Sequence, residues 1–536
     1  MENQNENIKS LIKEIRDRIG KPVSNRVVVA TIESLGIRNK DTESDYGIPS
    51  VYELADLVYY ELTQSEEHAD AKNLKEQEAE RTTRKYTLAD YPLLKAKIFM
   101  VYYPKGILHL LPVLLQIAAI IVFGYSLWTY VGFNHVQSTA VVLGVIIGLV
   151  VTGGFVQVIG RQASFYWNHE DFVMVRNTIN YLLRTGIKAL LVVIALIFLA
   201  NFTFHLYPME VLFIVFTYAF LIGLLLLVLA PLHTMHQGWV ISASMVIGTA
   251  LAITLKMQTD LKIYLTHWIG IIVAIVIARL FQVFYFRRLV KKGNHSSNLE
   301  VKPEVLFYHN YKFFLYGFFV YLFIFMDRIL AWSSTINGPL PYVVYFEKDY
   351  ELGMDMAILI FLLLTGVLEF SIASFTRFLD IGQKIYSYES PEAFNKSMLK
   401  MYKQHVALLF ATAAAVSVLI YFLIYASWGY KGQFHEDLLQ LSVNVCIMGG
   451  AGYLFLAWGM LNTLYLFTLS RPTAPLKAIV AACIVNFIVG FIGSRFISYE
   501  YSVLGMLAGS LVFMLMTLRA NLKFFNNLDY YYYAAY

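Results

Sequence analysis

The sequence predicts an all-α polytopic membrane protein, with about twelve transmembrane helices behind a small helical N-terminal cytoplasmic segment. Of its 536 residues, 58% are hydrophobic and only 15% are charged, whereas soluble domains carry about 25% charged residues. Residues 1–100 and a few later loops hold most of the charge. The apolar stretches between them show no strand-like alternation, and a backbone in lipid then satisfies its polar groups only as helix.

Twelve apolar stretches are long enough to cross a bilayer, which takes about 20 helical residues. The predicted spans are residues 106–130, 137–160, 186–206, 209–231, 236–256, 263–286, 311–333, 354–376, 402–427, 438–463, 475–496 and 500–522. Lys and Arg concentrate in the even-numbered loops, and the positive-inside rule places these loops in the cytoplasm. No apolar segment resembling a cleaved signal precedes residue 100. We therefore expect a multi-pass protein of the plasma (inner) membrane with cytoplasmic N- and C-termini.

Two matched polar stretches indicate a 6+6 internal repeat. Residues 161–185 follow the second span and residues 377–401 follow the eighth, and each predicts an amphipathic helix at the inner surface. The apolar stripes are Phe172, Val175, Ile179 and Leu182 in the first, and Phe394, Met398, Met401 and Tyr402 in the second. Six helices return the chain to the same side, so the halves should be related about the membrane normal.

The predicted domains follow from this repeat. They are a cytoplasmic N-terminal segment with its linker at 1–99, a first six-helix bundle at 100–286, a cytoplasmic linker at 287–310, and a second bundle with the C-terminal tail at 311–536. Within the first, apolar stripes predict helices over 8–19, 27–35 and 51–62. The almost wholly polar residues 64–85 predict a solvated helix or tether. This segment could dock a partner or simply stabilise the protein.

Charged residues within spans are the main candidates for function, because placing a charge in lipid is costly. Asp327 and Arg328 lie in the seventh span, Glu369 in the eighth and Arg279 in the sixth. Asp327 and Arg328 are sequence neighbours and point about 100° apart on a helix, so each needs a partner elsewhere. The alternative for all four is an ion pair that only holds helices together, such as Arg279 with Glu369.

Two polar residues of the first span, His109 and Gln116, lie seven residues apart on one helix face. Pro112 between them predicts a bend that presents both inward, although they could simply hydrogen-bond to neighbouring helices. His233 and His236 lack a third ligand nearby, so we expect neither a metal site nor a cofactor. Signals for catalysis are also missing from the sequence, with no phosphate-binding loop and no H-E-x-x-H motif, so we expect no enzyme activity. No clustered basic face with stacking aromatic residues predicts nucleic-acid binding.

The central part of the chain resembles a known transporter family. Two six-span halves with a long inner loop after the second helix of each resemble the multidrug/oligosaccharidyl-lipid/polysaccharide (MOP) exporter superfamily. The run Met326–Trp332 (MDRILAW), an outward loop with Tyr345, Tyr350 and Gly353, the run MDMAILI and a polar inner loop with Lys384, Tyr386, Lys396 and Tyr402 are most similar to the Pel exopolysaccharide exporter family. The resemblance implies that Asp327, Arg328 and Trp332 line a central cavity.

We therefore expect a transporter that moves an exopolysaccharide or a lipid-linked saccharide outward, by alternating access or as a conduit coupled to synthesis. The expected partners are membrane lipid, the saccharide and a cytoplasmic glycosyltransferase. Two alternatives remain open. One is a small-molecule/cation antiporter of the same fold, which should have a compact apolar cavity with one buried acid. The other is an integral membrane enzyme, such as an acyltransferase, which needs a buried histidine beside a cavity acid.

Overall fold

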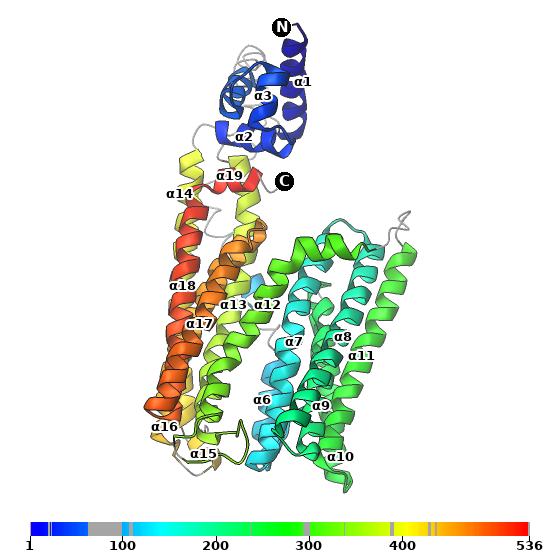
Figure 1. Ribbon diagram of the computed structural model, residues 1–536, viewed down its shortest axis with the longest axis vertical. Helices are drawn as coiled ribbons and strands as arrows, with labels where there is room; N and C mark the ends of the chain where they lie inside the picture. Colours follow the sequence, from blue (N-terminus) through cyan, green and yellow to red (C-terminus); the bar gives the residue numbers. More distant parts are fainter. Residues whose placement is uncertain are drawn as a thin grey trace.

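The structure is a computed structural model in which helices form two bundles and a separate N-terminal unit (Figure 1). It describes residues 2–19, 22, 24–62, 99–104, 106, 111–235, 237–292, 301–336, 338–385, 391–426, 430–434 and 437–533. Within these residues no β-strand forms. Eleven described helices are long and apolar enough to cross a membrane, and one further apolar helix is shorter. The predicted all-α polytopic fold is therefore confirmed.

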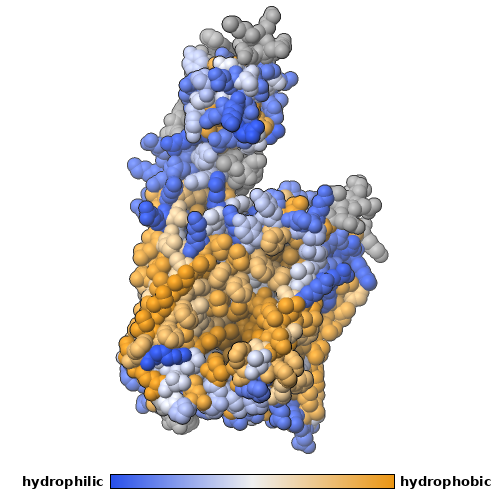
Figure 2. Space-filling model, in the orientation of Figure 1, coloured by the Kyte–Doolittle hydropathy of each residue, from blue (hydrophilic) through white to orange (hydrophobic). Residues whose placement is uncertain are grey.

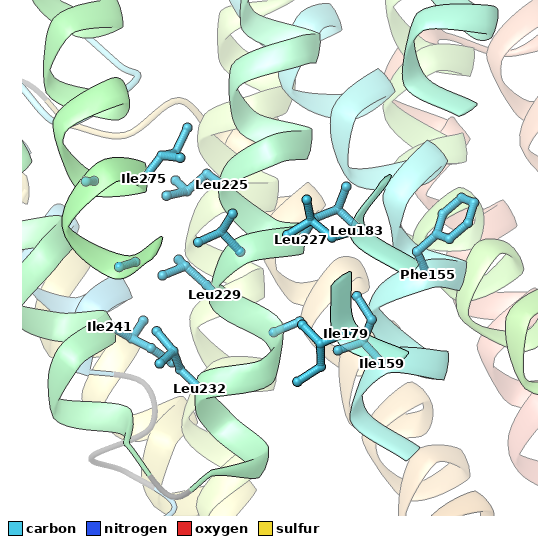
Figure 3. Packing of buried hydrophobic residues seen from close by; sticks show 14 of the residues in the cluster. Phe155, Ile159, Ile179, Leu183, Leu225, Leu227, Leu229, Leu232, Ile241 and Ile275 are labelled. Atoms are coloured by element: carbon cyan, nitrogen blue, oxygen red, sulfur yellow. The ribbon is translucent and has the colours of Figure 1, made fainter. Parts of the chain in front are cut away.

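The first bundle follows the order of the predicted spans. Its helices are α6 (Leu111–Phe123), α7 (His135–Asn168), α8 (Phe172–Phe204), α9 (Met209–Thr234), α10 (Gly238–Gln258) and α11 (Ile263–Lys292). Their apolar side chains meet in one core, where Ile159 of α7, Leu227 of α9 and Ile275 of α11 are buried (Figure 3). Since these side chains come from several helices, the bundle is held together by helix–helix packing.

The second bundle repeats this plan. Its helices are α12 (Pro303–Trp332), α13 (Lys348–Ile385), α14 (Pro391–Tyr425), the short α15 (Tyr430–Phe434), α16 (Gln440–Thr468), α17 (Thr473–Phe496), the 3₁₀ turn η2 (Tyr499–Ser502) and α18 (Val503–Asn526). Several helix pairings correspond between the bundles: α7 packs on α9 and α13 on α16, while α10 packs on α11 and α17 on α18. This correspondence fits the 6+6 repeat.

The surface of the two bundles supports a position in lipid. On the face that Figure 2 shows, a broad apolar band crosses both bundles and ends at polar zones on both sides. On α8, for example, Leu191, Val192 and Leu196 are each more than half exposed. An apolar surface of this extent is unfavourable in water and suits the hydrocarbon core of a bilayer. The N-terminal unit and α19 (Leu528–Tyr533) lie at the same end of the bundles (Figure 1), which we call the N-terminal side.

The first helix of each half packs on both bundles. Phe99 stacks edge-on against Phe370 of α13 at 5.2 Å, whereas α6 packs on α10 of its own half. In the second half, α12 packs on α7 of the first bundle and on α17 of its own. Glycines permit both of these contacts between the bundles. A Cβ at Gly106 would lie 2.7 Å from Gly366 Cα, and a Cβ at Gly317 would lie 2.7 Å from the Gly153 carbonyl oxygen.

The two matched polar stretches are not separate surface helices, and that part of the prediction is wrong. Helix α7 continues to Asn168, and after a short turn α8 begins at Phe172. The second stretch likewise extends α13 to Ile385 and begins α14 at Pro391. The predicted apolar stripes instead face the protein interior. Val175, Ile179, Leu182, Phe394, Met398, Met401 and Tyr402 are buried.

The N-terminal unit is a compact helical fold, as the stripes predict. It consists of α1 (Glu2–Ile19), α2 (Asn25–Ser34), α3 (Asn39–Tyr46) and a helix at 51–62, around a core that includes Ile15, Ile32 and Leu54. The polar α3 was not expected. Helix α2 packs on α19, where Arg26 donates a hydrogen bond to Asn527 at 3.2 Å. The predicted tether at 64–85 lies outside the described residues.

Candidate functional site

The charges of the seventh span belong to a polar cluster inside the second bundle. Asp327 and Arg328 lie on α12, five and four residues before its end at Trp332. At 1.5 Å per residue, Asp327 is about 7.5 Å from the end of the helix on the side opposite the N-terminal unit. Both side chains are buried, with exposed fractions of 0% and 2%. The observed end of the helix agrees within one residue with the predicted end of the seventh span at 333.

Each of these charges has its own partner, as their divergent directions require. Arg328 Nε donates to both carboxylate oxygens of Glu351 on α13, at 2.9 and 3.1 Å. Its Nη1 donates to the Ile324 carbonyl at 3.1 Å and to the Tyr453 hydroxyl on α16 at 3.2 Å. The Tyr350 hydroxyl donates to Asp327 Oδ2 at 2.7 Å. The cluster thus connects three helices of the second bundle.

The expected cavity-lining position of Asp327, Arg328 and Trp332 needs correction. All three are buried between helices, and Trp332 packs against Phe346 with ring centroids 5.3 Å apart. Their neighbours on α13 and α16 cover them, so they face the interior of the second bundle. Asp327 Oδ1 and Trp332 Nε1 are buried with no hydrogen-bond partner in the described structure. A role for these residues in transport stays a prediction.

Sequence reasoning missed two acids of this cluster. Glu351 was not among the candidate residues, yet it lies in the first turn of α13 and neutralises Arg328. Asp355 follows one turn later on the same helix face and, unlike Asp327, is exposed. Two acids at i, i+4 just before an apolar run were the available signal. Their pairing with α12 could not be inferred, because it depends on how two helices pack.

The suggested pair of Arg279 with Glu369 does not form. Arg279 donates to the side-chain oxygens of Asn180 on α8, at 2.7 Å, and of Gln282, at 3.0 Å. Glu369 is exposed on α13, and its Cβ lies close to Gly106. The two residues therefore belong to different bundles, and Arg279 is held by neutral amides within the first.

Gln116 serves packing in the first bundle. Its Nε2 donates to Thr249 Oγ1 of α10 at 2.8 Å, and its Oε1 accepts from the Leu127 backbone N–H at 2.8 Å. The side chain is buried and satisfied, which fits the alternative of a polar group bonded to its neighbours. His109 lies outside the described residues.

A cavity of about 600 Å³ opens on the N-terminal side, where the two bundles meet. Arg161 near the end of α7 contributes from the first bundle. The second bundle contributes the start of α12, the turn between α16 and α17 and the end of α18, and α19 follows. The lining includes Arg161, Tyr308, His309, Tyr311, Lys312, Phe313, Ser470, Arg471, Pro472, Thr473, Lys523 and Tyr531.

Aromatic and basic side chains dominate this cavity, and its lining contains no Asp or Glu among the described residues. The Arg161 guanidinium lies 3.6 Å from the centroid of the Phe313 ring, and Phe313 itself is buried. Arg471 lies 4.7 Å from the Tyr531 ring centroid. Such stacking holds the cations in place while leaving their N–H groups able to bind an anion.

The described part of the chain offers little for metal chemistry or a disulfide. It contains no group of three His, Cys, Asp or Glu side chains arranged to hold a metal ion. Cys446 and Cys483 are both buried free thiols. The enzyme alternative needs a buried histidine, and His405 is buried in the core of the second bundle, where its Nδ1 bonds to the Tyr465 hydroxyl at 2.5 Å. His236 lies outside the described residues.

Solved structures with the same arrangement are membrane transporters. An outward-facing multidrug resistance MATE family transporter of the MOP superfamily aligns with a TM-score of 0.54 and 12% identity, over 81% of this chain and 96% of the other. The chain has the fold of these transporters. A MATE protein in complex with MaD5 gives a TM-score of 0.57 at 12% identity, over 81% of this chain and 97% of that one.

The MOP fold is also shared by a transporter from Pyrococcus furiosus with a binding pocket described as reversed in polarity. It aligns with a TM-score of 0.55 and 11% identity over 80% of this chain and 96% of that one. No protein-family model matches the sequence, and no curated protein is significantly similar to it. The Pel exporter resemblance therefore finds no support in these comparisons beyond the fold.

Proposed function

We propose that this protein is a membrane transporter of the MOP fold that exports an exopolysaccharide or a lipid-linked saccharide. The observation that carries the proposal is the cavity on the N-terminal side, which is polar, aromatic and about 600 Å³ in volume. Binding sites for organic ligands commonly span 300–1,000 Å³. Tyr308, Tyr311 and Tyr531 line this cavity, and aromatic side chains suit the apolar faces of sugar rings.

The small-molecule/cation antiporter remains the second candidate, because solved neighbours include multidrug transporters. A cationic cargo favours a carboxylate in its site. The described lining of the cavity instead carries Arg161, Lys312, Arg471 and Lys523, which would repel a cation. The acids Glu351 and Asp355 lie near the opposite end of the second bundle. The charge of the cavity therefore favours a neutral or anionic saccharide.

The orientation belongs to the same proposal. The N-terminal side is the cytoplasmic side, and the membrane is the plasma (inner) membrane. The predicted inward loops carry most of the basic residues outside the N-terminal segment, and the cavity would receive cargo there from a glycosyltransferase. The N-terminal unit lies at this end of the bundles (Figure 1), where it could meet such an enzyme.

The test compares secretion of carbohydrate with efflux of a cationic dye in cells that depend on this protein. Tyr308→Ala and Tyr311→Ala remove rings that line the cavity, and both are expected to reduce secretion at least severalfold. Phe284→Ala, an exposed aromatic change on α11 outside the cavity, is the matched control and should secrete normally. Dye efflux that requires the protein, together with secretion that does not, would favour the antiporter and reject the exporter.

A further inference from the structure

A second recess, of about 540 Å³, lies between three helices of the second bundle. Helix α14 lines it with residues between 413 and 425, α16 lines it with residues between 443 and 454, and α13 contributes the buried Ile360. We propose that this α14–α16 recess binds one acyl chain of a membrane phospholipid. The site is separate from the cavity on the N-terminal side, and its ligand is independent of the cargo that the protein moves.

The recess exists because small side chains face the gap between α14 and α16. Ala413 and Ser417 lie one turn apart on α14, and Gly450 and Ala451 are adjacent on α16. A Cβ at Gly450 would lie 2.7 Å from Ile360 Cδ1, so α16 approaches α13 closely and leaves the space on the side of α14. Atoms around an empty space lose van der Waals contacts. A ligand that fills the recess would restore them.

The described lining suits a hydrocarbon chain. It includes no charged side chain. The Ser417 hydroxyl already donates to the Ala413 carbonyl at 2.9 Å, and Cys446 contributes a free thiol. An apolar cavity of about 150 Å³ is enough to bind benzene. A recess of about 540 Å³ therefore has space for a much longer apolar group.

The open side of the recess is continuous with the surface that faces lipid. Ile447 and Tyr421 line the recess and are 66% and 60% exposed. Val418 and Phe422, on the same helix as Tyr421, are also more than half exposed. All four lie in helices that are long and apolar enough to cross the membrane, so the recess opens to the bilayer. Lipid tails are as apolar as leucine, and a tail that enters from the bilayer loses no hydration.

The length and position of the recess match one leaflet. Helix α14 begins near α19, where Asn395 donates to Asp529 at 2.8 Å, and therefore ends on the side opposite the N-terminal unit. From Ala413 to Tyr425 it rises about 18 Å, close to half of a hydrocarbon core of about 30 Å. The rings of Tyr421 and Tyr425 lie 5.0 Å apart at this end, and tyrosine is typical of the headgroup level. The chain thus belongs to a phospholipid of the leaflet opposite the N-terminal unit.

The test maps where a phospholipid touches the protein. The full-length chain is placed in nanodiscs of phosphatidylcholine with a photoreactive diazirine in its acyl chain, and labelled residues are identified by mass spectrometry after illumination. Cys446 and Ile420 line the recess and are each 5% exposed. We expect them to be labelled at least as strongly as the exposed Leu196 and Leu199 of α8. Labelling of the α8 residues without the buried pair would mean that lipid only surrounds the protein, and would overturn the proposal.

Two substitutions narrow the recess from its two sides. Ser417→Leu and Ala451→Leu should each reduce labelling of Cys446 severalfold and leave labelling of α8 unchanged. Ala415→Leu is the matched control, because Ala415 is exposed on α14 and does not line the recess. Unchanged labelling of Cys446 in both narrowed variants, or an equal loss in Ala415→Leu, would contradict the site. The unfolding temperature of each variant checks its fold, and the labelling pattern of the unmodified chain tests the site even where a variant fails to fold.

A second copy of this chain is the other occupant that the test must distinguish. The mass of the unmodified protein in detergent is measured by gel filtration with light scattering. A monomer whose recess is labelled by lipid supports the proposal. A dimer that Ser417→Leu separates and Ala415→Leu does not would assign the recess to a helix of the second copy, and would reject the phospholipid.

Discussion

The Glu351→Gln substitution should strongly destabilise the protein, because it leaves the Arg328 cation buried without its counter-charge. Arg328 is 2% exposed, and the side chain of Glu351 is 13% exposed. Removing one partner of a buried pair costs about 3–5 kcal/mol. The Ile324 carbonyl and the Tyr453 hydroxyl still accept from Arg328. We therefore expect the lower end of that range, about 3 kcal/mol.

The chain offers a matched control for this prediction. Lys431 and Asp437 form an ion pair with the same 2.9 Å separation, but their side chains are 55% and 69% exposed. Exposed pairs contribute about 0–1 kcal/mol, so Asp437→Asn should change stability little. The assay is unfolding of both variants in the same detergent, followed by tryptophan fluorescence. A double change of Arg328 and Glu351 to Leu should recover much of the loss, since paired apolar replacements are often neutral.

Equal stabilities of Glu351→Gln and Asp437→Asn would refute this reasoning. That result would mean that water or another group compensates Arg328 as well as Glu351 does. A double Leu variant less stable than Glu351→Gln would also contradict it, because the buried charge would then not be the source of the loss.

Two further predictions concern the candidate site and the N-terminal unit. Asp327→Asn keeps an acceptor for the Tyr350 hydroxyl, so it should lower the free energy of unfolding by only about 1 kcal/mol. Carbohydrate secretion should nevertheless fall. A stable variant with normal secretion would remove Asp327 from the site. Deletion of residues 1–85 should leave a monodisperse helical protein on gel filtration, because the described contacts of the N-terminal unit with the rest of the chain are limited to the packing of α2 on the short α19 and exposed hydrogen bonds such as Arg26 to Asn527. Aggregation of the truncated chain would show that the unit is integral to the fold.

The fold was largely predictable because lipid imposes a simple rule on sequence. Segments without charge must be long and helical to cross it, so eleven spans could be recognised from apolarity alone. The first span was harder to define. The segment around Phe99 packs on the second bundle, whereas α6 packs on the first. Hydropathy cannot show which neighbour a helix contacts. The apolar stripe from Phe394 to Tyr402 was recognised from the sequence. The sequence did not show that the stripe packs against protein rather than lipid, because the protein interior and the lipid are both apolar.

The candidate site was less predictable, for the same physical reason. A charge in an apolar run can be recognised as unusual, and Asp327 and Arg328 were identified in this way. Their partners depend on helix contacts between α12, α13 and α16, which no local pattern encodes. The N-terminal-side cavity brings together Arg161 and Arg471 from opposite halves of the chain. Both lie in even-numbered loops, which the positive-inside rule assigns to the cytoplasm. Their approach to one cavity follows only from the packing of the two bundles.

The contacts of the two first helices bear on whether either half could be stable alone. Gly106 meets Gly366 of α13, and Gly317 meets Gly153 of α7, at corresponding positions in the two halves. Each half thus places one face of its first helix against the other bundle while packing its remaining surface on its own bundle. A half produced alone would leave its side of these glycine contacts uncovered. The two halves are therefore reciprocal parts of one unit rather than autonomous modules.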